Sequence, residues 1–304
     1  MNVMKSMNVM TRNKNQTIKH GKNVMPKITP AIRSALYRCG MDPYLTGTEL
    51  LEQFMFTKTG QVRPILGKST KTEKGNGAGY YTAIAYLAPA KLAGINLCPF
   101  ATDGCAAACL AHSTGNLKFP ANQRVQVIKA LWFHLFRDAF IETVKAEIRL
   151  KDVQARALGK VCAIRLNGST DIQWERYIDT SEFPNVWFYD YTKFPVKARD
   201  KREHNYHLTY SYSEDPNADK RAKEWLDAGG NVAVVVAGPK GSKLAAAKKA
   251  AKHIIQQGFK GYPVLDGDKN DARFDDKPGH WVALYAKGEK AQADSTGFVQ
   301  RIDA

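Results

Sequence analysis

Short apolar segments that end in polar residues recur along the chain, and this alternation most constrains its fold. Continuous apolar strands are typical of a parallel sheet that is buried on both faces. Helical or loop stretches separate the segments, and the clearest helix pattern runs from Ser242, a good N-cap residue, to Gly258. The apolar segments are residues 80–88, 161–166, 186–189, 206–210, 232–236, 262–265 and 281–285.

These strands and the stretches between them predict an α/β fold, a TIM-like or partly open (β/α) barrel of about six to eight mostly parallel strands. Residues 30–56 have a helical pattern with a break near Pro43, and residues 121–150 have the pattern of one long helix. We expect residues 34–304 to form a single domain and residues 1–33 to form a disordered basic N-terminal arm.

The composition limits the classes of partner and the compartment. The formal net charge is +16, and the N-terminal arm contains Lys and Arg without Asp or Glu. Such a chain attracts polyanions, so we expect a nucleic acid or a nucleotide as partner. No run of 18 apolar residues is present, so no membrane span is predicted. The few, clustered cysteines favour reduced thiols and a cytoplasmic location. The sequence leaves the oligomeric state open.

Cys98, Cys105 and Cys109 lie close together and are the strongest chemical signal in the chain. Three thiolates on a short segment can bind one iron–sulfur cluster and leave one iron open for a ligand. Zinc is an alternative, with His112 as a further ligand, although zinc sites usually have more closely spaced cysteine pairs. Burial of these cysteines as small hydrophobic residues is the structural alternative.

Polar residues follow most of the predicted strands. In β/α barrels the active site lies at the carboxyl ends of the strands, so we expect these residues to meet at one rim. Structural ion pairs among them are an equally open interpretation. The residues that we expect to contact substrate are Tyr191, Lys193, Asp268, Asp271 and Arg273.

Several motifs then occur in a recognisable order, among them Leu97-Cys98-Pro99 and the polar strand ends at residues 165–172, 188–193 and 266–274. With these motifs the chain resembles an uncharacterised family of tailed-phage and plasmid proteins related to the phage "gene product eighty-eight" domain, over about residues 65–300. The resemblance implies a phage or prophage origin and therefore the cytoplasm of a host cell. It does not imply an activity.

The same layout is similar to a distant radical S-adenosylmethionine (SAM) enzyme. That resemblance implies a [4Fe–4S] cluster bound by Cys98, Cys105 and Cys109, with SAM bound at later strand ends. The cysteines here are separated by six and then three residues, a wider spacing than is usual in those enzymes. The SAM-binding residues implied in this way are Asn167, Asp171, Ser211, Ser213 and Glu214.

We therefore expect an iron–sulfur enzyme of radical-SAM type that acts on a nucleotide or nucleic acid. A first alternative is a nucleic-acid-binding protein with structural zinc or no metal, in which the arm and a basic stretch contact phosphates. A second is a metal-dependent nuclease that uses Asp266, Asp268 and Asp271. The basic stretch consists of Lys193, Lys197, Arg199, Lys201 and Arg202.

Overall fold

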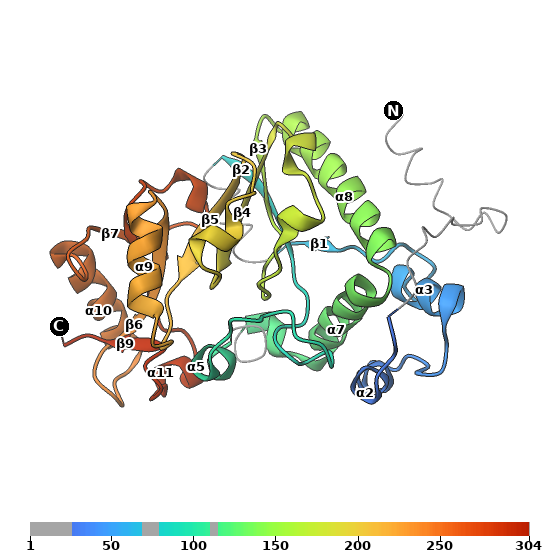
Figure 1. Ribbon diagram of the computed structural model, residues 1–304, viewed down its shortest axis with the longest axis horizontal. Helices are drawn as coiled ribbons and strands as arrows, with labels where there is room; N and C mark the ends of the chain where they lie inside the picture. The colour runs from blue at the N-terminus through green and yellow to red at the C-terminus, as the bar shows by residue number, and fades with distance from the viewer. Residues whose placement is uncertain (1–25, 69–78, 110–114, 304) are drawn as a thin grey trace.

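The computed structural model describes residues 26–68, 79–109 and 115–303, and its strands form one sheet (Figure 1). The sheet contains nine strands in the order β1-β2-β3-β4-β5-β6-β8-β7, with β9 beside β6. The strands are β1 (Leu66–Gly67), β2 (Tyr80–Ala85), β3 (Val161–Arg165), β4 (Val186–Thr192), β5 (Tyr206–Ser211), β6 (Asn231–Ala237), β7 (Val264–Asp266), β8 (Trp281–Tyr285) and β9 (Val299–Arg301).

Helices of two kinds connect these strands. The α-helices are α2 (Pro30–Arg38), α3 (Gly47–Met55), α5 (Asp103–Ala107), α7 (Pro120–Leu135), α8 (Arg137–Ala157), α9 (Ala218–Asp227), α10 (Leu244–Gln257) and α11 (Glu289–Gln292). The 3-10 helices are η1 (Gly115–Lys118), η2 (Trp174–Arg176), η3 (Thr180–Glu182), η4 (Val196–Arg199) and η5 (Arg273–Asp275). None of the described helices is long and apolar enough to cross a membrane.

The sheet is mostly parallel and open. β1 pairs antiparallel with β2, whereas the pairs from β2 to β9 are parallel. β1 and β7 are the two edges of the order, and no pairing joins them within the described residues. The α/β class and the parallel strands are thus confirmed, but the sheet is not closed into a TIM barrel. One reason is that the β3–β4 and β4–β5 connections contain only 3-10 helices, so the outer helix layer that a closed barrel needs is incomplete.

Every predicted strand is present, with small shifts at its ends, while the short strands β1 and β9 were not predicted. The predicted helix over residues 121–150 is instead two helices that meet at Phe136, whose φ of −136° and ψ of 58° are not helical. The turn lets α8 fold back on α7, with the Trp132 and Phe140 rings 5.2 Å apart. Lys243, rather than Ser242, occupies the N-cap of α10. Residues 30–33 of the expected arm belong to α2, and residues 1–25 lie outside the described residues.

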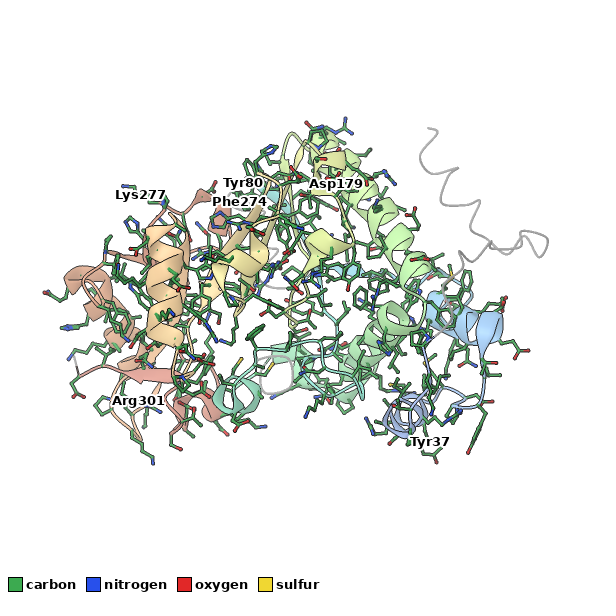
Figure 2. All side chains as sticks on the ribbon, viewed as in Figure 1. Tyr37, Tyr80, Asp179, Phe274, Lys277 and Arg301 are labelled. Atoms are coloured by element: carbon green, nitrogen blue, oxygen red, sulfur yellow. The ribbon has the colours of Figure 1, made fainter. Side chains whose placement is uncertain are left out.

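The two faces of the sheet are covered differently. α8 packs on β2 and β3, and α10 packs on β6, β7 and β8, so helices cover one face. On the other face the connection from β7 to β8 crosses back, and η5 within it contacts β4 and β5. Its Phe274 ring stacks on Trp187 at 5.7 Å and meets Tyr80 at 4.9 Å between centroids, as Figure 2 shows for Tyr80 and Phe274. This crossing holds the segment between β7 and β8 against β4 and β5.

Two buried charged side chains, Glu147 and Lys129, hold the edge strand β1 in place through its backbone. The Glu147 carboxylate accepts hydrogen bonds from the backbone N–H of Ile65 at 2.8 Å and of Leu66 at 2.7 Å. The Lys129 ammonium donates to the Ile65 carbonyl oxygen at 2.9 Å. Both charged side chains are buried, so these contacts replace the water that the charges and the peptide groups lose.

We predict that Glu147→Ala lowers the free energy of unfolding by about 3 kcal/mol, because it leaves two buried N–H groups without their acceptor and removes the negative charge near the buried Lys129. Urea denaturation followed by circular dichroism measures the change. The matched control is Glu142→Ala on the exposed side of the same helix, which should change stability by less than about 0.5 kcal/mol. Equal effects of the two substitutions would refute this account of β1.

Candidate functional site

The three clustered cysteines face one cavity at the carboxyl edge of the sheet. Cys98 follows β2, Cys105 lies in α5, and Cys109 follows α5, which Figure 1 shows below β4 and β5. All three line a cavity of about 160 Å³. The predicted meeting of cysteines and strand ends is therefore present. The rest of the wall comes from Pro89, Ala90, Ala101, Ala106, Ser169, Thr170, Asp171, Tyr191, Thr192, Lys193 and Ser211.

Burial favours the neutral form of the Cys98 and Cys105 thiols. The Cys98 Sγ lies 3.3 Å from the Ala90 nitrogen and 3.7 Å from the Ser169 carbonyl oxygen. Burial raises the pKa of Cys98 to about 12, since a thiolate there would lose its hydration. Burial also raises the pKa of Cys105, although the nearby Lys193 ammonium acts in the opposite direction. Any metal that binds here must displace protons.

The three thiols line one cavity, but their sulfur atoms are not close enough together to bind one metal ion. Among the described residues, no three Cys, His, Asp or Glu side chains are grouped closely enough to hold a metal ion. His112, the expected further ligand for zinc, lies outside the described residues. The donor atoms are those that an iron–sulfur cluster uses, but the sulfurs must move toward one another before they can bind one.

Lys193 places an ammonium group in the wall of the thiol cavity. Its Nζ donates to the carbonyl oxygen of Ser211 at 2.9 Å, to the Ser211 Oγ at 3.0 Å and to the Tyr212 carbonyl oxygen at 3.4 Å. It also lies 5.2 Å from the centre of the Phe298 ring. These acceptors are neutral, so the positive charge of Lys193 remains available to an anion in the cavity.

Asp171 connects the cysteine loop to the ends of β3 and β4. Its backbone N–H donates to the Leu97 carbonyl oxygen at 3.0 Å, and its Oδ2 accepts from the Lys193 backbone N–H at 2.7 Å. The Arg199 guanidinium lies 3.5 Å from its other oxygen. Burial nevertheless raises the pKa of Asp171, and the side chain remains on the cavity wall. Asp171 is thus a buried acid within the cysteine site.

Glu214, which the SAM resemblance places near a ribose, holds the N-terminus of α5. Its carboxylate accepts from the Gly104 backbone N–H at 2.6 Å and from the Thr102 Oγ1 at 2.8 Å. The Thr102 Oγ1 in turn accepts from the Cys105 backbone N–H at 3.3 Å. A Cβ added at Gly104 would lie 2.0 Å from the Thr296 Oγ1, so α5 needs glycine there to pack this closely. Glu214 therefore positions the cysteine helix.

Asn167 and Ser213 are engaged within their own loops. The Asn167 Oδ1 accepts from Thr170 Oγ1, Ile172 N and Trp174 Nε1 at 2.9–3.0 Å, which closes the loop after β3. Ser213 is buried, and its Oγ accepts from the Asp215 backbone N–H at 3.5 Å. Of the five residues expected to bind SAM, only Asp171 and Ser211 line the thiol cavity.

Of the residues expected to contact substrate, most line one of two cavities, and some of them also belong to a buried network of charged groups. Asp271 lies 3.3 Å from Arg165 NH1, and the Arg165 guanidinium lies 4.9 Å from the centre of the Tyr191 ring. Burial raises the pKa of Tyr191 to about 12, so its phenol stays protonated at neutral pH. Arg273 is buried and donates to the Asn270 carbonyl oxygen at 2.7 Å. This network packs against Tyr191, which lines the thiol cavity.

A second cavity of about 390 Å³ adjoins the thiol cavity and shares Cys105, Cys109 and Ser169 with it. Its surface is mainly apolar and includes aromatic rings, with a few charged groups at one side. Asp268 is one of them, and its carboxylate accepts from Lys287 Nζ and from the Tyr285 backbone N–H. The remaining lining residues are Ala108, Leu117, Gly168, Val235, Gly267, Asn270, Asp271, Leu284, Ala291 and Phe298. A mostly apolar cavity with few polar groups suits a small organic ligand.

The structure does not group the carboxylates of the nuclease alternative. Asp266 is exposed, Asp268 contacts Lys287, and Asp271 contacts Arg165. No three acidic or other metal-ligating side chains come together in the described part of the chain. Two residues of the predicted phosphate-binding stretch, Lys193 and Arg199, are buried, and Arg199 pairs with Glu175. Side chains buried in this way do not reach a nucleic-acid backbone.

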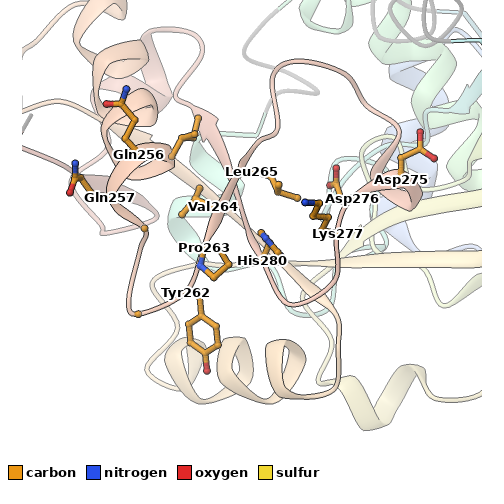
Figure 3. A pocket seen from close by; sticks show the side chains of 13 residues that line it. Gln256, Gln257, Tyr262, Pro263, Val264, Leu265, Asp275, Asp276, Lys277 and His280 are labelled. Carbon is orange, nitrogen blue, oxygen red and sulfur yellow. The ribbon is translucent and has the colours of Figure 1, made fainter.

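A larger cavity of about 600 Å³, shown in Figure 3, lies at the amino ends of β7 and β8. No cysteine lines it. Val264 and His280 lie on its wall, as does Asp276, whose pKa is raised to about 6 by burial. Asp276 pairs with Arg273 at 3.2 Å. Ligands of parallel α/β sheets bind at the opposite, carboxyl edge, so we place the functional site at the cysteines.

Comparison with known proteins identifies the family. Residues 58–302 match the family described as Gene product 88, so the chain belongs to this phage family, whose function is unknown. The family resemblance is therefore confirmed, whereas the radical-SAM resemblance gains no support. No curated protein and no solved structure matches the chain.

We predict that Glu214→Ala loosens the cysteine segment, because two hydrogen bonds at the start of α5 lose their acceptor. Hydrogen exchange at residues 102–109 should become faster, and the free energy of unfolding should fall by about 2 kcal/mol. Glu203→Ala, at an exposed position, is the control and should leave exchange in this segment unchanged. Unchanged exchange in both variants would contradict the positioning role of Glu214.

Proposed function

We propose that this member of the Gene product 88 family is an iron–sulfur enzyme and that Cys98, Cys105 and Cys109 are its cluster ligands. The observation that carries the proposal is that these three thiols line one cavity at the carboxyl edge of a parallel sheet. Thiolates are the usual ligands of iron–sulfur clusters, and three of them leave one iron open. Cys105, Cys109 and Ser169 line both cavities, so a cluster held by the thiols would be next to the second cavity.

The second cavity is the proposed site of the organic cofactor or substrate, with SAM as the proposed cofactor. Such a cluster would supply to bound SAM the electron for its reductive cleavage to a radical, and an external one-electron donor would have to reduce the cluster first. The chain contributes a buried acid, Asp171, and an ammonium group, Lys193, on the wall beside the thiols. Tyr191 closes the same wall, and Asp268 faces the second cavity. Asp271 and Arg273 keep this wall rigid through their buried contacts. The net charge of +16 favours a nucleotide or nucleic-acid substrate.

Zinc is the alternative occupant of the same thiols. It binds thiolates in a tetrahedral arrangement and would make the site structural unless a position stays open. Zinc binding would leave the protein colourless, whereas a cluster absorbs visible light. The two occupants therefore differ in a direct measurement.

We expect anaerobically purified protein to contain iron and acid-labile sulfide and to be brown. Cys98→Ser, Cys105→Ser and Cys109→Ser should each reduce iron by more than about tenfold, since loss of a ligand weakens a three-thiolate site. Cys39→Ser is the matched control, because Cys39 lies apart from this cavity and should not affect iron content. Iron at background in the wild type would refute the cluster. One equivalent of zinc without iron would replace it with the zinc alternative.

We also expect metal affinity to rise with pH. The pKa of Cys98 is raised to about 12, so its proton is still bound at neutral pH and must leave when the metal binds. Each thiol that loses a proton should make binding about tenfold tighter per pH unit below its pKa. Titration with cobalt(II) between about pH 6 and 8, read from the thiolate charge-transfer band, measures the slope. Cys98→Ser should lower the slope by one proton, and a pH-independent affinity would count against thiolate ligation.

A further inference from the structure

The outer side of α2 combines exposed tyrosine rings with guanidinium groups. Tyr37 and Tyr44 are 75% and 80% exposed, far more than a core-forming aromatic residue. The Arg33 guanidinium lies 5.5 Å from the centre of the Tyr44 ring, and its NH1 donates to the Pro43 carbonyl oxygen at 2.5 Å. Figure 2 shows Tyr37 at the margin of the molecule. We call Arg33, Tyr37, Arg38 and Tyr44 the α2 surface.

The α2 surface belongs to a helix whose other side is packed in the core. The opposite side of α2 carries Ile32, Ala35 and Leu36, which are buried in the core. A Cβ added at Gly94 would lie 2.7 Å from the Ala31 carbonyl carbon, so the loop before Cys98 packs directly on α2. The exposed rings therefore do not serve the packing of the helix, and their loss should not unfold it.

The sequence up to and including α2 carries charge of one sign. The first 41 residues contain no Asp or Glu, and Asp42 is the first acidic residue of the chain. The side-chain oxygen of Asp42 accepts the Tyr44 backbone N–H at 2.8 Å. Within these 41 residues the basic side chains are Lys5, Arg12, Lys14, Lys19, Lys22, Lys27, Arg33 and Arg38.

We propose that the α2 surface binds single-stranded nucleic acid. Flat aromatic side chains stack on unpaired bases, and neighbouring Lys and Arg attract the phosphates, which together give affinity without sequence preference. A membrane-binding helix would instead expose large aliphatic residues, but those of α2 are buried. The family match begins at residue 58, so this surface is additional to the matched region and does not depend on the proposed metal centre.

Fluorescence anisotropy of the full chain with a labelled oligo(dT) or oligo(U) tests the proposal. We expect binding that weakens steeply with salt, and about fivefold or greater loss of affinity in the Tyr37→Ala/Tyr44→Ala variant. Tyr37→Phe/Tyr44→Phe keeps the rings and should keep the affinity. Arg38→Gln should reduce the slope of log affinity against log salt by about 0.7, the value for one phosphate contact on a single strand.

Arg149→Ala/Arg156→Ala is the matched control, since both side chains are exposed cations on α8. It should bind the oligonucleotide as the wild type does, and thermal unfolding should show that all variants are folded. If the double tyrosine-to-alanine variant binds as tightly as the wild type, the rings have no role and the proposal fails. It fails equally if the chain binds phosphatidylglycerol vesicles but not oligonucleotides at low salt.

Discussion

The parallel direction of neighbouring strands is the constraint on which the rest of this structure depends. β2 to β6 lie side by side in chain order, so the polar residues that follow them meet at one edge. Many of these side chains are buried there, and a buried charge without a partner is costly. The edge therefore requires a network of ion pairs and hydrogen bonds, and the cavities occupy the space that this network leaves open.

Within this edge, some polar residues fix the backbone while others face a cavity. Asn167 and Glu214 use their side-chain oxygens on backbone N–H groups, so they shape the loop after β3 and the start of α5. Asp171 does both, because one oxygen holds the Lys193 backbone while the side chain lines the thiol cavity. The ammonium group of Lys193 donates to neutral oxygens of Ser211 and Tyr212. The ends of β4 and β5 thus place one ammonium group, that of Lys193, beside the thiols.

The strands and the meeting of polar residues at one edge could be predicted from the sequence because they follow from local apolar runs and from parallel pairing. The break at Phe136 could not, since the apolar helical pattern continues on both sides of it and the turn becomes evident only where the Trp132 and Phe140 rings meet. The capping role of Glu214 was equally hidden, because its partner Gly104 lies more than a hundred residues earlier in the chain. The only local signal was Thr102, an N-cap residue before an Ala-rich run.

The packing of α2 connects the α2 surface with the thiol cavity. The loop of residues 89–97 lies between α2 and the thiol cavity, with Gly94 against Ala31 and with the Leu97 carbonyl oxygen accepting the Asp171 N–H. A strand of nucleic acid stacked on Tyr37 would therefore lie against the element that leads to Cys98. Glycine at position 94 is what permits this close approach, since any larger residue would push α2 away. The α2 helix and the cysteine loop are thus packed as one unit, so a polyanion bound at the first is held at a fixed distance from the second.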